Sequence, residues 1–253
     1  MVNPILLNIF GLEIRYYGIL LALAFLFGYF ISLKFIKEKF NLSKSKVENF
    51  LLVLTVSMII GARLFEVFFY DFNYYFSDPK MIFYIWHGGL ASHGALIGAV
   101  LATLWFARKN KLKFYDVADI LAIPIALGTV FVRIGNFING ELVGKITNVS
   151  WGVKFDDYEG IRHPVQIYQA VTNFITFLTL LYARTLKNLP SGFLFWLFMI
   201  MFSVFRFITE FYKDLPLDYG LHAYGLDLAQ YLSVLIFIIS IVFMARIFKN
   251  NKK

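Results

Sequence analysis

The sequence predicts an all-α integral membrane protein with seven transmembrane helices, an N-terminus on the outer (periplasmic) side and a C-terminus in the cytoplasm. Three observations support this fold class: the apolar composition, the spacing of the apolar runs, and the distribution of Lys and Arg. Of 253 residues, 59% are hydrophobic and only 16% are charged, and the mean hydropathy is +0.68. Soluble domains carry about 25% charged residues, so this composition indicates a polytopic membrane protein.

Apolar windows of about 20 residues, the length of a membrane-spanning helix, recur along the chain. They fall at residues 16–35, 48–70, 89–107, 116–135, 164–183, 190–211 and 227–246. The runs are continuously apolar instead of alternating, which favours helices over the strands of a barrel. We expect one polytopic membrane domain over residues 1–253, with an outer-side loop region around 137–163.

Basic residues gather in alternate loops and in the C-terminal tail, a distribution typical of cytoplasmic segments. They are Lys34, Lys37, Lys39, Lys44, Lys46, Arg108, Lys109, Lys111, Lys113, Arg184, Lys187, Arg246, Lys249, Lys252 and Lys253. The other loops, 71–87, 137–163 and 213–226, are mixed or acidic and include Asp218. This bias predicts the orientation stated above.

The net charge of +8 does not indicate a nucleic-acid partner, because the basic residues lie in short loops between apolar runs. The lipid bilayer is the partner that such a pattern predicts. The chain has no cysteine, which excludes a disulfide framework, a thiolate metal site and a thiol nucleophile of its own.

Arg133 stands near the end of the apolar run 116–135, one turn before a polar cluster that contains Asn136, Asn139 and Glu141. A cation in such a place is costly unless it is satisfied, so it is a functional candidate. No acidic residue occupies the positions three or four residues away from it. Its counter-charge must therefore come from another helix or from a ligand.

The predicted orientation places further polar groups at a similar depth, toward the outer surface. They are Tyr17, Arg63, Glu66, His93, His163, Gln166, Arg206 and Glu210. The pairs Arg63–Glu66 and Arg206–Glu210 are spaced i, i+3 and i, i+4, so each pair has a purely structural reading as self-neutralising charges on one helix face. His93, taken alone, could equally be a structural residue that packs between helices and has its hydrogen bonds satisfied within the protein.

Arginines and a histidine in the outer leaflet suit an anionic lipid headgroup, because Arg grips phosphate through two parallel hydrogen bonds. A transporter favours sites near the midplane with broken helices, whereas these charges lean to one face. A sensor needs a signalling surface, and the cytoplasmic loops are short and basic. We therefore favour an enzyme acting on membrane lipid, with a membrane transporter or sensor for an anionic ligand as the alternative.

The run from Arg133 to Glu141, RIGNFINGE, resembles the signature of the bacterial prolipoprotein diacylglyceryl transferases. Five further segments resemble that family in order: residues 15–18, 61–64, 88–94, 162–168 and 206–210. Gln230 and Ser233 also resemble residues of that family, but less closely than the segments above. Departures from the family pattern fall at Glu66, Ser92 and Ala95, and concern details of pocket shape.

The resemblance implies transfer of the diacylglyceryl group from phosphatidylglycerol to the lipobox cysteine thiol of a preprolipoprotein, with release of glycerol phosphate. It places the chain in the bacterial cytoplasmic (inner) membrane, with the active site toward the outer leaflet. We assign catalytic roles to His93 as general base and to Arg133 and Arg206 as phosphate ligands. Substrate binding is assigned to Tyr17, Arg63, Asn136, Asn139, Glu141 and Glu210, the last by holding Arg206. We expect no cofactor, and no metal, since no His/acid pair shows ligand spacing.

Overall fold

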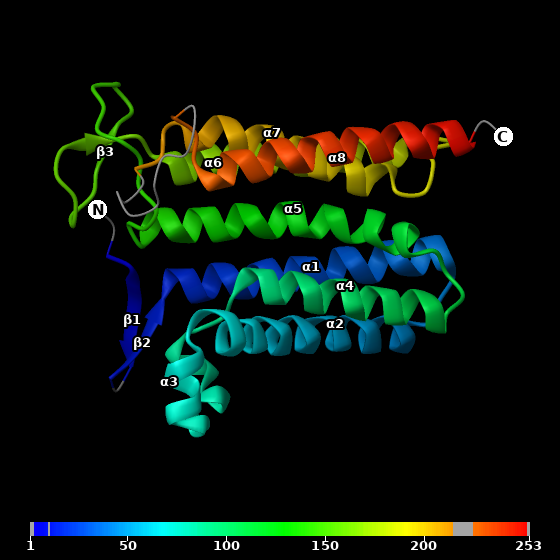
Figure 1. The fold of residues 1–253 in the computed structure, drawn as a ribbon, viewed down its shortest axis with the longest axis horizontal. Helices are drawn as coiled ribbons and strands as arrows, with labels where there is room; N and C mark the ends of the chain where they lie inside the picture. The colour runs from blue at the N-terminus through cyan, green and yellow to red at the C-terminus, as the bar shows by residue number, and fades with distance from the viewer. Residues whose placement is uncertain (1–2, 10, 215–224, 252–253) are drawn as a thin grey trace. The chain divides into compact units, whose positions relative to one another are not determined.

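The computed structural model describes residues 3–9, 11–214 and 225–251, and most of that length is helical (Figure 1). Its contacts divide the chain into two compact units, Met1–Ser32 with Asp119–Lys253, and Leu33–Ala118. The unit boundaries fall inside two helices, α1 (Tyr16–Phe40) and α5 (Phe114–Ile138). The single domain that the sequence predicts over residues 1–253 therefore stays a prediction.

The first unit begins with a hairpin that the sequence analysis did not predict. Strand β1 (Ile5–Ile9) pairs antiparallel with β2 (Leu12–Arg15), with Leu7 opposite Ile14. The first turns of α1 and most of α5 follow. The unit continues with β3 (Val153–Lys154), β4 (Ile161–Arg162), α6 (Val165–Thr185), α7 (Phe193–Glu210) and α8 (Leu228–Asn251).

The helices α6, α7 and α8 lie side by side in Figure 1, with α7 in contact with both of the others. The start of α7 is fixed by Asp119 of α5, whose carboxylate accepts hydrogen bonds from the backbone N–H groups of Gly192 and Phe195, each at 2.8 Å. A carboxylate at this position satisfies N–H groups that have no partner within the helix. Asp227 and Gln230 form a reciprocal cap at the start of α8, at 2.7 and 3.0 Å.

Arg162 ties the loop region around 137–163 to the end of α7. Its guanidinium donates to the carbonyl oxygens of Glu159 and Gly144, at 2.9 and 3.1 Å, and to the carboxylate of Asp214. Gly144 also forms a β-bridge with Lys213. The loop is therefore an ordered part of the first unit and lies against the residues that follow Glu210.

In the second unit, α2 (Lys44–Phe65) continues through a π-helical turn (Glu66–Tyr70) into a loop with three short helices, α3 (Phe72–Ser77), Pro79–Phe83 and Ile85–His87. Helix α4 (Ser92–Lys109) then packs along α2 (Figure 1). The two backbones touch at Gly61, Gly94 and Gly98, where a Cβ on any of the three would collide with the backbone of the facing helix. Small residues allow such close packing.

Each predicted apolar window coincides with a helix: α1, α2, α4, α5, α6, α7 and α8. Among the described residues, five helices are long and apolar enough to cross a membrane, namely α1, α2 with its π turn, α5, α7 and α8. The helices α4 and α6 are not among them: α4 is as long as α7 but carries His93, Arg108 and Lys109, and α6 carries Gln, Asn and Thr side chains. An integral membrane protein with several apolar helices is thus confirmed, while the seven spans stay a prediction.

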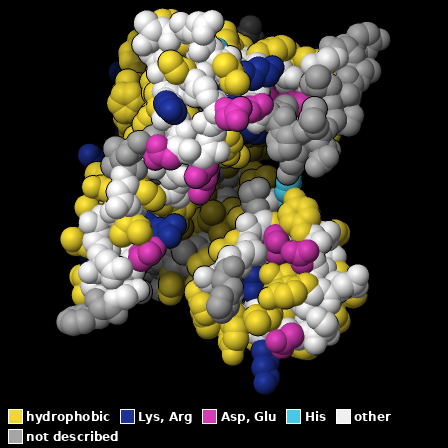
Figure 2. Space-filling model, turned by 90° about the vertical axis from the view of Figure 1, so that its left-hand side faces the viewer, with side chains coloured by type: hydrophobic (Ala, Val, Ile, Leu, Met, Phe, Trp, Pro, Cys, Tyr) yellow, Lys and Arg dark blue, Asp and Glu magenta, His cyan; other side chains and the backbone are white. Residues whose placement is uncertain are grey.

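Asp218, Lys252 and Lys253, which entered the predicted orientation, lie outside the described residues. Figure 2 views the molecule from the side that lies at the left of Figure 1. Asp and Glu side chains (magenta) form several small groups there among hydrophobic ones. The orientation of the termini itself stays a prediction.

We expect Gly98→Ala to destabilise the protein by about 1–3 kcal/mol, because the added methyl group meets the backbone of Ser57 and forces α2 and α4 apart. Gly28→Ala in α1 is the matched control, since its nearest neighbour is Pro124 Cβ at 4.0 Å. Thermal unfolding in detergent measures both. An unchanged or raised Tm for Gly98→Ala contradicts the close packing.

Candidate active site

The segment Arg133–Glu141 folds back on itself at the end of α5. Gly140 has a positive φ of 70°, and the backbone N–H of Glu141 donates to the carbonyl of Asn136 at 2.9 Å. This turn brings the Glu141 carboxylate to two amides: Asn136 Nδ2 donates to one oxygen at 2.9 Å, and Asn139 Nδ2 to the other at 3.0 Å. Gln166 of α6 donates to the Glu141 carbonyl at 2.6 Å. Asn136, Asn139 and Glu141 thus form one hydrogen-bonded cluster.

Arg133 borders this cluster and keeps most of its donors unused. Within the described chain, its guanidinium makes one protein hydrogen bond, from Nη1 to Asn136 Oδ1 at 3.4 Å. Tyr17 of α1 lies close by, because its ring packs on Gly135, where a Cβ would come within 2.6 Å of it. Glycine at 135 therefore allows Tyr17 to approach the face of α5 between Arg133 and Asn136.

Glu210, at the end of α7, is shared by two cations. Its side chain is 1% exposed, Arg206 Nε lies 3.0 Å from Oε2, and Lys213 Nζ lies 2.9 Å from Oε1. Lys213 also donates a full hydrogen bond to Oε1, whereas the contact with Arg206 brings the charges together without hydrogen-bond geometry. One carboxylate between two cations leaves a net positive charge, and it fixes where Arg206 lies.

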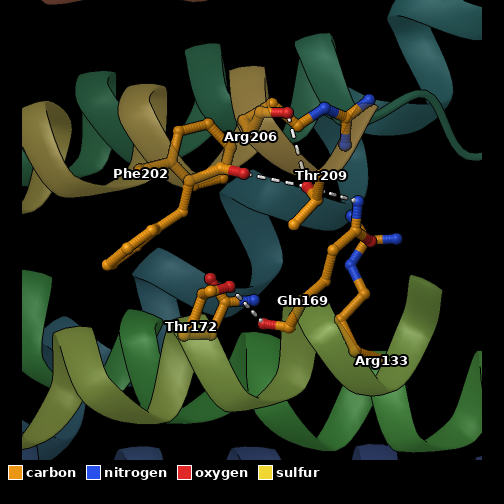
Figure 3. A pocket seen from close by; sticks show the side chains of 8 residues that line it. Arg133, Gln169, Thr172, Phe202, Arg206 and Thr209 are labelled. Atoms are coloured by element: carbon orange, nitrogen blue, oxygen red, sulfur yellow. Dashed lines mark hydrogen bonds between the residues drawn. The ribbon is translucent and has the colours of Figure 1, made fainter. Parts of the chain in front are cut away.

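Arg133 and Arg206 line the same open pocket between α5, α6 and α7 (Figure 3). Both guanidiniums extend from their helices toward it. The remaining lining combines neutral polar and aromatic side chains: Gln169, Thr172, Asn173, Phe202, Phe205 and Thr209. Two arginines from different helices are therefore brought together within the first unit, as an anion-binding site requires.

Arg63, in the second unit, has a different environment. It is 5% exposed, and its guanidinium donates to the backbone carbonyls of Ile82, Gly88 and Gly89 at 2.7–2.9 Å, to those of Met81 and Tyr84, and to the Tyr75 hydroxyl at 2.9 Å. The Tyr75 ring lies 4.6 Å from the guanidinium carbon. No ion pair joins Arg63 to Glu66 in the described chain, so the i, i+3 self-neutralisation that we considered does not form there. The donors of Arg63 hold the loop before α4.

His93 lies in the first turn of α4, directly after that loop. Its Nδ1 is 3.1 Å from the Tyr70 hydroxyl, and its ring stacks on Phe65 at 5.7 Å between centroids. The backbone N–H of Ala91 donates to the Ala62 carbonyl at 3.1 Å and ties the start of α4 to α2. The described residues contain no group of three or more His, Asp or Glu arranged as metal ligands.

Of the predicted site residues, the first unit contains Tyr17, Arg133, Asn136, Asn139, Glu141, Arg206 and Glu210, and the second contains Arg63 and His93. The sequence analysis missed Gln169, Thr172, Asn173 and Thr209 of the pocket, and Lys213 beside Glu210. A signal for part of this set was available: Gln169, Thr172 and Asn173 are spaced i, i+3, i+4 and share one face of α6.

Comparison with known proteins assigns the family. The family model described as prolipoprotein diacylglyceryl transferase matches residues 4–246. Relatives named phosphatidylglycerol–prolipoprotein diacylglyceryl transferase include one from Geobacter sulfurreducens, which is 35% identical over 95% of this chain and 93% of its own. Another, from Tolumonas auensis, is 38% identical over 96% of this chain and 94% of its own. This chain therefore belongs to the prolipoprotein diacylglyceryl transferase family.

Proposed function

We propose that this chain transfers the diacylglyceryl group from phosphatidylglycerol to the lipobox cysteine thiol of preprolipoproteins and releases glycerol phosphate, the first step of bacterial lipoprotein maturation. The observation that supports it best is the pocket that Arg133 and Arg206 line together. The relatives reported above are all named as transferases, and none of them as a transporter or a sensor.

The proposed reaction forms one bond and breaks another. The substrate sulfur bonds to the third glycerol carbon of the diacylglyceryl group, and the bond from that carbon to the phosphate oxygen breaks. The thiol proton leaves with a base, and glycerol phosphate leaves with one more negative charge than the phosphodiester had. Fixed cations stabilise such developing charge most when they are in place beforehand. Arg133 and Arg206 have that role in our proposal.

Arg133 suits direct phosphate contact, because its guanidinium has donors that the protein does not use. Arg206 is held by Glu210 through Nε, which leaves the terminal nitrogens for a ligand. Tyr17, Asn136, Asn139 and Glu141 position the glycerol headgroup, whose hydroxyls both donate and accept hydrogen bonds. We assign Glu210 to the positioning of Arg206, as its ion pair indicates.

His93 is our assignment for the base that takes the thiol proton, since the thiolate is the reactive form of cysteine and histidine titrates near neutral pH. The contact with Tyr70 indicates which tautomer of the His93 ring would act as the base. When Nδ1–H donates to the tyrosine oxygen, Nε2 keeps its lone pair and is able to accept a proton. Arg63 acts on the same segment: we infer that it holds the loop before α4, and so positions His93, instead of contacting phosphate.

We place the N-terminus outside and the C-terminus in the cytoplasm, with α4 and α6 crossing the bilayer together with the five more apolar helices. The orientation is supported by the basic residues, which gather in alternate loops and in the C-terminal tail, as they do in cytoplasmic segments of membrane proteins. In this arrangement Arg133, Arg206 and Glu210 lie at the outer ends of α5 and α7, in the outer leaflet of the inner membrane. Preprolipoprotein thiols emerging on that side would reach the phosphate from outside.

The direct test incubates the purified protein with phosphatidylglycerol and a lipobox peptide, followed by mass spectrometry of the peptide. We expect a mass increase equal to one diacylglyceryl group, and no increase for a peptide with Ser in place of the lipobox Cys. An unmodified peptide, combined with anion uptake into sealed vesicles, would favour the transporter alternative.

We expect Arg133→Gln to lower kcat/KM by about 10²–10³-fold, because a charge-stabilising donor is lost. Arg133→Lys is expected to recover only part of this loss, since Lys supplies the charge without the paired hydrogen bonds. Arg246→Gln in α8, whose guanidinium packs on Phe243, is the control. Full activity of Arg133→Lys would show that paired hydrogen bonds to phosphate are not formed there.

We expect His93→Asn to lower the rate strongly and to change the pH dependence of the reaction, because the group proposed to take the thiol proton is lost. The remaining activity should increase only at the higher pH where a free thiol ionises. The pH dependence of kcat/KM measures this. A near-wild-type rate with an unchanged profile would assign the base to another group.

We expect Arg63→Lys to loosen the loop of residues 78–91, because one ammonium group cannot replace the donors that Arg63 gives to five carbonyls and a hydroxyl. Hydrogen–deuterium exchange in that segment should become faster. Arg15→Lys, at an exposed pair with Glu13, is the control. If hydrogen–deuterium exchange of the loop is unchanged in Arg63→Lys while phosphatidylglycerol binding weakens, Arg63 contacts the lipid and does not act by holding the loop.

A further inference from the structure

The pocket that contains Arg133 and Arg206 continues into a neutral polar region formed mainly by α6. Gln169, Thr172 and Asn173 of that helix line it, and Figure 3 shows Gln169 and Thr172 opposite Thr209 of α7. Gln169 is 7% exposed, and its Nε2 donates to Thr209 Oγ1 at 3.3 Å. Thr172 donates to the carbonyl of Gln169 at 3.1 Å. Neither the proposed phosphate ligands nor the headgroup cluster includes these side chains.

Asn173 is the member of this group for which the described residues supply no hydrogen-bond partner. Its amide has two N–H donors and a carbonyl acceptor, and none of them bonds to another group in the described part of the chain. Helix–helix contacts in membranes use amides and hydroxyls as interhelical hydrogen bonds, which accounts for Gln169 with Thr209. It does not account for Asn173, which is half-buried and lines the pocket, so that its amide is free to bond to a ligand there.

The lining changes in character along the pocket. Figure 3 shows Arg133 and Phe202 at opposite ends of the labelled side chains, with Gln169 and Thr209 between them. On α7, Arg206 and Phe202 are four residues apart, which is about 6 Å along the helix axis. The order is therefore cationic, then neutral and polar, then aromatic. A phospholipid has the same order of chemistry: an anionic phosphate, the ester groups of the glycerol backbone, and the acyl chains.

We propose that Asn173, together with Gln169, donates hydrogen bonds to the ester carbonyl oxygens of the lipid's glycerol backbone while the arginines bind its phosphate. The assignment rests on the proposed function and names the part of the lipid that this region recognises. Asn173 is then a substrate-binding residue that selects diacyl lipids over lipids without carbonyl groups beside the glycerol.

The test compares diester phosphatidylglycerol with its dialkyl ether analogue, which keeps the headgroup and the breaking bond but has no ester carbonyls. We expect the wild-type protein to prefer the diester by roughly 2- to 10-fold in kcat/KM, the effect of a neutral hydrogen bond. Asn173→Leu, similar in size and without donors, should lose this preference by reacting more slowly with the diester alone. Thr179→Val, on α6 outside the pocket lining, should keep it.

Three outcomes overturn the assignment while leaving the transferase in place: no ester preference in the wild type, an unchanged preference in Asn173→Leu, or a change only in the KM for the peptide. A large fall in the Tm of Asn173→Leu with equal loss toward both lipids would make Asn173 structural. Failure of the wild type to modify the peptide with either lipid would overturn the proposed function, and the assignment with it.

Discussion

The buried carboxylate of Glu210 is the interaction on which the candidate site depends. An arginine within a membrane-spanning helix is stable only when its charge is balanced or solvated, and Glu210 balances Arg206 and Lys213 at once. Because the carboxylate is shared, each cation receives only part of a counter-charge. The pocket beside Arg206 therefore keeps a positive potential after folding, which an unshared ion pair would have cancelled. A phosphate is the ligand that this potential favours.

The three arginines that the sequence analysis names as site residues, Arg63, Arg133 and Arg206, show how the partners of a side chain decide its role. Arg63 donates to five carbonyls and a hydroxyl, so no donor remains for a ligand. Among the described residues, Arg133 makes a single long bond, to Asn136, and Arg206 makes one ion pair, with Glu210. The same side chain thus organises a loop in one unit and leaves an open binding site in the other. Residue type and predicted depth alone do not distinguish the two cases; the hydrogen-bond partners do.

The sequence predicted the apolar helices well, because a continuous apolar run is a local signal. It also named Arg133, Arg206 and Glu210, since ionisable residues stand out in apolar runs. It missed the β1–β2 hairpin, whose strands are only 5 and 4 residues long, and the order of the loop around Arg162, which depends on contacts distant in the chain such as that with Asp214. It missed Lys213, which looks like an ordinary loop lysine until the loop folds onto Glu210, and Asn173, whose importance depends on the pocket that α5 and α7 complete.

The central claim is that Arg133 and Arg206 together bind a lipid phosphate, and native mass spectrometry of the purified protein tests it without any catalytic step. Wild-type protein presented with equal amounts of phosphatidylglycerol and zwitterionic phosphatidylethanolamine should retain phosphatidylglycerol preferentially. The Arg133→Gln/Arg206→Gln double variant keeps Lys213 beside Glu210 and should retain both lipids alike. An unchanged preference for phosphatidylglycerol in that variant would contradict the account.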